Sequence, residues 1–278
     1  MNKTITIGNS KPLCALGQGT WFMGDNPARR AGEIQSLRKG IDLGMSVIDT
    51  AEMYGDGRSE SLVGEAIRGK RDQVYLISKV LPSHASRQGT KAACEASLKR
   101  LGTDVIDLYL LHWQGRYPFS ETVSAMIELV REGKIIDWGV SNMDVPEMEE
   151  FYDIPDGKTC AANEVLYNVS RRGIEFDLIP WCKKRSLPII AYSPIEQGRV
   201  LESTVLRELG EKHGVTPAQI ALAWLFRQDG IMAIPKAASI NHVEENFEAL
   251  SIPLTQDDLK VLDEQFPPPR GKVPLEML

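Results

Sequence analysis

The sequence predicts an α/β fold, a closed (β/α)8 TIM barrel formed by one domain that spans residues 1–278. Eight short apolar segments recur along the chain, and stretches with helical periodicity separate them, which indicates a parallel sheet covered by helices. The length agrees, because ~250 residues is typical of such a barrel. An open, doubly wound parallel sheet would show the same alternation and is the competing architecture.

The expected strands follow an N-terminal β-hairpin, which we predict to turn at residues 8–10. Each apolar segment is too short for a helix and is rich in Val, Ile, Leu or Tyr, as strands covered on both faces are. In chain order, the expected barrel strands are residues 13–20, 46–50, 74–79, 107–112, 138–142, 161–166, 189–193 and 231–236.

The segments between the strands show helical spacing of their apolar residues. A capping box, Thr216 to Gln219 with Pro217 at the first helical position, predicts the start of one helix. After Phe266 the short C-terminal tail contains three consecutive prolines, so we expect it to leave the barrel and lie on its surface. The clearest apolar stripes are Ile34, Leu37 and Ile41; Cys94, Leu98 and Leu101; and Val123, Met126, Ile127 and Val130 before Gly133.

Composition excludes several classes of function. The net charge is −6 with both signs scattered, and the absence of a long basic run argues against a nucleic-acid partner. No segment approaches the ~20 apolar residues of a membrane span, and the N-terminus lacks the apolar segment of a signal peptide. We therefore expect a cytoplasmic protein without a membrane partner. The four cysteines lack metal-ligand spacing, which favours buried free thiols over a disulfide framework and predicts no metal site.

Polar side chains stand at or near the ends of most predicted strands. In a parallel barrel the carboxyl ends of the strands share one face, and active sites of this fold are built there. Residues far apart in sequence should therefore converge around one opening. Any one of them could instead only cap a loop, but seven such residues at one rim favour a functional site. These residues are Asp49, Lys79, His112, Asn142, Glu164, Tyr192 and Lys236.

The sequence resembles the aldo-keto reductase superfamily over nearly its whole length, in particular the small bacterial members that include methylglyoxal reductases. The longest matching segment is IDTAEMYGDGRSESLVGEAI, residues 48–67. The resemblance implies a catalytic tetrad of Asp49, Tyr54, Lys79 and His112. Further matching segments are GTW (19–21), SKV (78–80), DLYLLHW (107–113), GVSN (139–142), AYSP (191–194) and IPKAASINHVEEN (234–246).

The chemistry of carbonyl reduction fits these four residue types. Hydride addition to a carbonyl carbon leaves an alkoxide, which needs a proton donor within hydrogen-bond reach. Tyr54 can supply the proton, although a free phenol has a pKa near ~10. The Lys79 ammonium is expected to lower that pKa, and Asp49 to hold Lys79 charged and oriented. His112 can donate from its ring to the substrate oxygen and so polarise the carbonyl.

A phosphate-binding region is expected near the last two barrel strands. Residues 17–19 lack the third glycine of a dinucleotide fingerprint, so no Rossmann unit is indicated. Barrels often bind phosphate in the loops after strands seven and eight, and helix N-termini present free N–H groups to anions. Ser193 and Pro194 follow the seventh expected strand, and Lys236 and Ser239 precede a predicted helix.

The resemblance implies NADPH or NADP+ as the cofactor, with NADH as a weaker alternative. Tyr192 is expected to stack on the nicotinamide, Ser141 and Asn142 to bind its carboxamide, and Lys236 to meet the 2′-phosphate. Glu245 and Asn246 are expected near the adenine. The full set of implied cofactor contacts is Gly19, Thr20, Trp21, Asp49, Ser141, Asn142, Glu164, Tyr192, Ser193, Pro194, Gln197, Lys236, Ser239, His242, Glu245 and Asn246.

Two positions depart from the common pattern of the family. Glu164 replaces the usual Gln of the carboxamide site, and an ionised carboxylate can accept from an amide NH2 but cannot donate to its carbonyl. Its charge would also favour the positively charged oxidised ring. His242 replaces the common Arg near the 2′-phosphate, which weakens the case for strict NADPH selectivity. Neither change touches the tetrad.

The expected substrate is a small carbonyl compound, held in an apolar pocket. A short tail favours an open pocket that accepts aldehydes, dicarbonyls and ketones. The aromatic residues of this pocket could alternatively be ordinary packing at the barrel rim. The expected pocket residues are Trp21, Tyr54, His112, Trp113 and Phe119.

Two other functions compete with carbonyl reduction. Lys79 at a barrel strand end is compatible with a Schiff-base aldolase, since a desolvated lysine can act as a nucleophile. That reading leaves Tyr54, Tyr192 and the expected phosphate site unexplained. A redox-sensing module that holds NADPH is the non-enzymatic alternative, but such proteins usually extend beyond the barrel. We expect a monomer or weak homo-oligomer.

Overall fold

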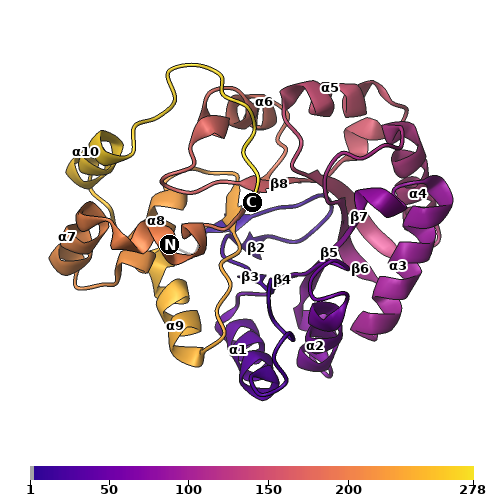
Figure 1. Ribbon diagram of the computed structural model, residues 1–278, viewed down its shortest axis with the longest axis horizontal. Helices are drawn as coiled ribbons and strands as arrows, with labels where there is room; N and C mark the ends of the chain where they lie inside the picture. The colour runs from indigo at the N-terminus through magenta and orange to yellow at the C-terminus, as the bar shows by residue number, and fades with distance from the viewer. Residues whose placement is uncertain (1–2) are drawn as a thin grey trace.

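Eight parallel strands form the centre of the structure, a computed structural model that describes residues 3–278. They are β3 (Gln18–Gly19), β4 (Val47–Asp49), β5 (Tyr75–Val80), β6 (Ile106–Leu111), β7 (Ile135–Ser141), β8 (Asn163–Leu166), β9 (Ile189–Tyr192) and β10 (Ile231–Ala233). They pair in chain order, and a parallel bridge between Leu16 and Ala233 joins the first edge to the last. The sheet therefore closes into a barrel with helices outside it, as the sequence predicts (Figure 1).

The predicted N-terminal hairpin consists of β1 (Thr4–Ile5) and β2 (Leu13–Cys14), which pair antiparallel around the turn at residues 8–10. This pairing divides the expected first barrel strand, residues 13–20. Its first two residues belong to the hairpin, and only residues 18–19 form a strand of the barrel sheet. A strand that pairs antiparallel outside the barrel must turn before it can enter a parallel sheet, so residues 13–20 do not form one continuous strand.

Apolar side chains fill the barrel interior, and the hairpin closes its N-terminal end. Ile5 and Ile7 of the hairpin belong to the inner cluster of buried residues. Asn9 donates to both oxygens of the Asp137 carboxylate on β7, at 3.0 and 2.9 Å. Because alternate strand residues face opposite sides, a larger second cluster lies between strands and helices. The inner cluster also contains Val47, Ile77, Leu108, Leu110, Ile190 and Met232.

One helix begins and another ends where the sequence signals predict. The capping box at Thr216 is present, with Gln219 donating from its backbone to the Thr216 hydroxyl, and Gly133 after α4 takes a φ of +70°. The helices are α1 (Arg30–Leu43), α2 (Arg58–Ile67), α3 (Arg87–Leu101), α4 (Phe119–Arg131), α5 (Val145–Asp153), α6 (Leu178–Lys184), α7 (Thr204–His213), α8 (Pro217–Leu225), α9 (Ile240–Glu248) and α10 (Gln256–Gln265). None of the helices in residues 3–278 is long and apolar enough to span a bilayer.

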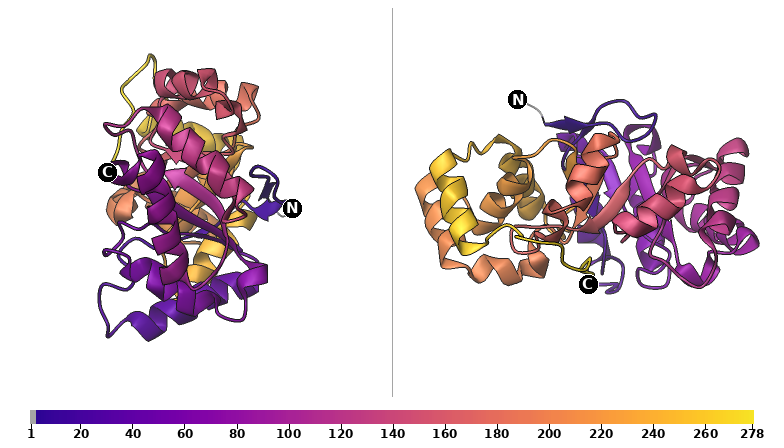
Figure 2. Two further views of the ribbon diagram at one scale, coloured as in Figure 1. Left: turned by 90° about the vertical axis from the view of Figure 1, so that its right-hand side faces the viewer. Right: turned by 90° about the horizontal axis from the view of Figure 1, so that it is seen from above.

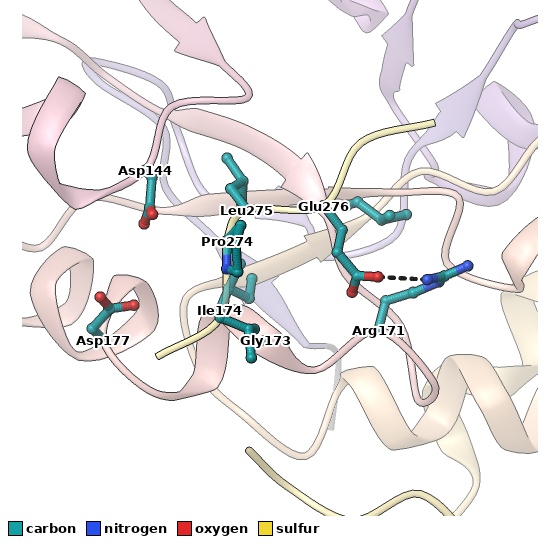
Figure 3. Close-up of a pocket in the computed structure, with 10 residues that line it drawn as sticks. Asp144, Arg171, Gly173, Ile174, Asp177, Pro274, Leu275 and Glu276 are labelled. Carbon is teal, nitrogen blue, oxygen red and sulfur yellow. Dashed lines mark hydrogen bonds and ion pairs between the residues drawn. The ribbon is translucent and has the colours of Figure 1, made fainter. Parts of the chain in front are cut away.

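The C-terminal tail leaves α10 and crosses the end of the barrel opposite the hairpin, so the hairpin and the tail lie on opposite sides (Figure 2). Lys272 pairs with Asp144 at 3.0 Å and Asp177 at 2.7 Å. Glu276 pairs with Arg171, as the dashed line in Figure 3 shows. The short tail is therefore held against the loops after β7 and β8, at the end of the barrel where the strands finish. We call this end the mouth.

Candidate active site

Four side chains meet at the mouth of the barrel. Asp49 ends β4, Lys79 stands one residue before the end of β5, and His112 directly follows β6. The Lys79 ammonium lies 2.7 and 2.6 Å from the two carboxylate oxygens of Asp49 and 3.4 Å from the hydroxyl of Tyr54. The Tyr54 and His112 rings meet edge to face with centroids 5.9 Å apart. The structure thus brings together the four residues that the resemblance implies.

The chain after β4 returns Tyr54 to the mouth. The loop is fixed from both sides, since Thr20 donates its hydroxyl to the Asp49 carbonyl at 2.8 Å and the Ser59 hydroxyl donates to Thr20 at 2.8 Å. Lys79 also donates to the Thr50 carbonyl at 3.1 Å. These contacts fix the loop that carries Tyr54, and so they hold its hydroxyl beside the buried ion pair of Asp49 and Lys79.

Burial and charge set the protonation of Lys79 and Tyr54. Burial alone would lower the pKa of Lys79, but the charge of Asp49 and its hydrogen bonds raise it above its ordinary value, so the side chain is an ammonium. Burial raises the pKa of Tyr54 above its ordinary value, and the nearby Lys79 only partly offsets this. Lys79 therefore lowers the pKa of Tyr54 as expected, but burial raises it by more. Tyr54 is a neutral phenol that can donate its proton.

His112 is neutral in this environment. Its side chain is buried, and burial together with the charge of Lys79 holds its pKa well below the ordinary value. A neutral imidazole keeps one N–H donor and carries no charge that would compete with Lys79. Trp113 packs against the ring at a centroid distance of 4.7 Å. His112 can therefore polarise a carbonyl oxygen through a hydrogen bond without acting as a charged acid.

Glu164 faces the tetrad from β8. Its Oε1 lies 3.3 Å from the Lys79 ammonium, and its Oε2 has no hydrogen-bond partner among the described residues. Burial and the charge of Asp49 raise its pKa well above the ordinary value. Both effects disfavour the ionised carboxylate that is expected from the sequence at this position.

The residues implied for the nicotinamide carboxamide form one network. Tyr192 donates its hydroxyl to Asn142 Oδ1 at 2.9 Å, and Asn142 Nδ2 donates to the His112 carbonyl and the Ser141 hydroxyl, both at 3.0 Å. Asn142 has a φ of +58°, a left-handed conformation that Asn tolerates better than most residues. Strain of this kind concentrates at functional sites, where surrounding contacts maintain it.

The residues implied for the cofactor phosphate lie in the segment between β10 and α9. Lys236 is exposed, and Ser239 caps α9 by accepting from the backbone N–H of His242 at 3.4 Å. Gly19 donates to the Pro235 carbonyl at 3.0 Å, and a Cβ at Gly19 would lie only 2.6 Å from the Ile234 carbonyl oxygen. Glycine is therefore required where β3 meets this segment. On α9, Glu245 is half-buried and Asn246 is buried.

The loop after β9 contains a feature that the sequence did not reveal. Ser193, Glu196 and Gln197 all have positive φ although none is glycine, and Pro194 between them is buried. The buried carboxylate of Glu196 holds the loop in place through three donors. Asn168 donates to it at 2.8 Å, Arg171 at 3.0 Å and Arg199 at 2.8 Å. Glu196 and its three partners were missed because single polar residues in loops carry no periodic signal.

The aromatic residues expected at the pocket separate into two groups. Trp21 and Trp113 lie partly exposed at the mouth, and Trp21 stacks on the exposed Phe22 at a centroid distance of 4.4 Å. Phe119 does not reach the site. It is buried at the start of α4 and stacks on Phe151 of α5 at 4.0 Å. The prediction for Phe119 was wrong because the sequence after residue 118 does not show whether this residue belongs to a pocket loop or to the first turn of a helix.

Arg171 links the loop after β9 to the tail. Replacing Arg171 with Met should free the tail, because the same guanidinium contacts Glu196 and Glu276. We expect faster trypsin cleavage after Lys272 while the rest of the chain stays resistant. Arg207→Met, an exposed substitution on α7, is the matched control. Equal cleavage rates in all three proteins would mean that other contacts hold the tail.

Comparisons with known proteins agree with this geometry. The model of the aldo/keto reductase family matches residues 15–265. Methylglyoxal reductase YeaE of Escherichia coli (strain K12) is 48% identical over 281 residues, which cover 99% of each chain. Glyoxal reductase of Bacillus subtilis (strain 168) is 34% identical and covers 82% of each chain.

Solved structures show the same relationship. The aldo/keto reductase from Klebsiella pneumoniae, crystallised in complex with NADP and acetate, has a TM-score of 0.98 and 49% identity, and each chain is covered completely. A second structure from that organism, in complex with NADPH, gives the same values. The matching segments, the barrel and the four residues at its mouth lead to one conclusion. The chain belongs to the aldo/keto reductase family.

Proposed function

We propose that this protein reduces the carbonyl group of small aldehydes and ketones to an alcohol with NADPH, and that Tyr54 is the proton donor. The observation that carries the proposal is the buried Asp49–Lys79 pair beneath the Tyr54 hydroxyl, with His112 beside it. The family, the relatives named as methylglyoxal and glyoxal reductases, and the NADP and NADPH complexes of similar structures support it.

The described residues fit a nicotinamide cofactor. The buried Glu164 Oε2 and His112 Nδ1 lack partners among residues 3–278, and such unpartnered buried polar atoms support a site that a polar ligand completes. The Asn142 and Tyr192 network lines the same end of the barrel. Lys236 and the N-terminus of α9 supply a positive site for a phosphate. The bound cofactor supplies a hydride to the carbonyl carbon.

The protein's own residues then manage the charge on oxygen. His112 and the Tyr54 hydroxyl hold and polarise the carbonyl oxygen by hydrogen bonds. As negative charge develops there, Tyr54 transfers its proton to the oxygen, and the phenolate that remains is stabilised by Lys79 at 3.4 Å. Asp49 keeps Lys79 charged and oriented. The low-dielectric surroundings strengthen each of these interactions.

The aldolase alternative is disfavoured by the state of Lys79. A lysine that forms a Schiff base must be a neutral amine, which requires a lowered pKa. Here Asp49 raises the pKa of Lys79 above its ordinary value, and both oxygens of Asp49 contact its ammonium. A reductase forms no imine, so borohydride with a carbonyl substrate should leave Lys79 unmodified.

The direct test of the function is the loss of reduced-nicotinamide absorbance with methylglyoxal or a substituted benzaldehyde. Oxidation of NADPH that depends on the carbonyl compound is the expected result. Binding of NADPH without turnover on any member of a carbonyl panel would instead favour the redox-sensing module. The free cysteines of residues 3–278 fit a reducing compartment, and we propose a cytoplasmic location.

Cofactor choice should depend on Lys236. Replacing Lys236 with Met should weaken NADPH about ten- to a hundredfold, because a hydrogen bond to a charged group contributes about 1.5–3 kcal/mol, and should leave NADH nearly unchanged. Fluorescence titration with both cofactors measures this. Lys260→Met, an exposed substitution on α10, controls for the general loss of positive charge. Equal weakening of both cofactors would refute a contact between Lys236 and the 2′-phosphate.

A further inference from the structure

Two carboxyl groups and one ammonium group lie together at the base of the site. The Lys79 ammonium is 2.6 Å from Asp49 Oδ2 and 3.3 Å from Glu164 Oε1, and the side-chain exposure is 0% for Lys79 and 2% for each carboxyl group. With both carboxyls ionised, the three groups would carry a net negative charge away from water. Two carboxylates in one buried site cannot both ionise cheaply. The geometry therefore calls for one proton on the pair.

The contacts of Glu164 indicate where this proton lies. Its Oε2 has no hydrogen-bond partner among the described residues, and its Oε1 lies 3.3 Å from the same Lys79 ammonium that contacts both oxygens of Asp49. Two carboxylates repel each other, but a protonated carboxyl donates to an ionised one. The titratable groups that face Glu164 are Asp49 of β4, Lys79 of β5, Tyr54 of the loop after β4 and Tyr192 of β9, with His112 after β6 facing Lys79.

We propose that Asp49 and Glu164 share one proton beside Lys79 in the ligand-free site, and that this proton leaves to solvent when the oxidised nicotinamide binds. The second part rests on the NADPH function proposed above. The oxidised ring carries a positive charge and the reduced ring is neutral. A positive charge at the mouth, near Tyr192, lowers the cost of an ionised Glu164 through Coulomb attraction. The neutral reduced ring does not stabilise the ionised form of Glu164 in this way.

This arrangement makes the protein sensitive to the redox state of its cofactor. Binding of NADP+ is accompanied by release of a proton, whereas binding of NADPH is not. The preference for NADP+ over NADPH should then increase as pH rises. The increase is up to about tenfold per pH unit between the pKa of the carboxyl pair with NADP+ bound and its pKa in the ligand-free site. Glu164→Gln keeps a donor toward Asp49 and an acceptor toward Lys79 but cannot lose a proton in this range. The variant should bind both cofactors without this pH dependence.

Calorimetric titrations in two buffers with different ionisation heats measure the proton release. At about pH 8 the 2′-phosphate, with a pKa near ~6, stays ionised. We expect close to one proton released per NADP+ by the wild type and close to none per NADPH, with the difference lost in Glu164→Gln. Asp258→Asn in α10, outside the site, is the matched control, because burial would raise the pKa of Asp258 but its hydrogen bonds with Lys212 and Thr255 bring it below its ordinary value. It should behave like the wild type.

Infrared spectra of the ligand-free proteins test the shared proton without any cofactor. The stretching band of a protonated carboxyl group should be present in the wild type and in Asp258→Asn and absent from Glu164→Gln. An unchanged band in Glu164→Gln, or equal proton release with NADP+ and NADPH in the wild type, overturns the proposal. If the wild type turns over no carbonyl compound but passes both tests, only the proposed function fails.

Discussion

Tyr54→Phe should reduce kcat by ~100- to 10,000-fold, the usual contribution of general acid catalysis, while cofactor affinity barely changes. The substitution removes the hydroxyl that lies 3.4 Å from Lys79 and leaves the ring that packs edge to face on His112. Without that proton donor, the alkoxide must take its proton from water or from the neutral His112. Steady-state kinetics with methylglyoxal and a separate titration with NADPH measure the two effects.

Tyr75→Phe is the matched control for this substitution. Tyr75 is the first residue of β5, four positions before Lys79 on the same strand, and its buried hydroxyl has no partner within residues 3–278. Its removal should leave kcat unchanged. A Tyr54→Phe protein that keeps more than about a tenth of wild-type kcat would show that another group donates the proton.

The strands could be predicted from local signals, and the tetrad from the resemblance of the segments around it to a known family. Short apolar runs mark strands covered on both faces, and the carboxyl ends of those strands must share one face. The segment at residues 13–20 was only partly correct, since an apolar run does not reveal which neighbour it pairs with. Phe119 was misplaced for a similar reason, because a single aromatic residue fits a pocket and a helical layer equally well.

The protonation states could not be predicted from the sequence. A phenol beside a lysine is expected to have a lowered pKa, yet burial raises the pKa of Tyr54 and outweighs that charge. Likewise, Glu164 reads as a carboxylate until its distance to Lys79 and its depth in the barrel are known. Both outcomes depend on how far water is excluded, which is a property of the assembled barrel.

Lys79→Met should lower both activity and stability. Loss of the ammonium leaves Asp49 and Glu164 buried without their cation, and breaking a buried pair in this way costs about 3–5 kcal/mol. We expect kcat to fall at least as far as in Tyr54→Phe, because the phenolate loses its stabilising charge. Urea denaturation and steady-state kinetics measure the two effects independently.

The stability loss in Lys79→Met should depend on pH. Without the ammonium the folded-state pKa of Asp49 rises further above its unfolded value, because burial then acts unopposed. A carboxyl with a raised folded pKa contributes its stability below the unfolded pKa and loses it as pH rises through the folded pKa. The variant should therefore be closest to the wild type in acid and furthest from it in mildly alkaline solution.

A double-mutant cycle separates the charge effect from lost packing. Asp49→Asn combined with Lys79→Met removes the unpaired carboxylate, so the double variant should regain stability relative to Lys79→Met and lose much of its pH dependence. It should regain no activity, since Tyr54 still lacks its cation. A double variant that is no more stable than Lys79→Met at any pH would show that the loss comes from packing around residue 79. In that case the Asp49–Lys79 pair would orient Tyr54 without contributing to the stability of the barrel.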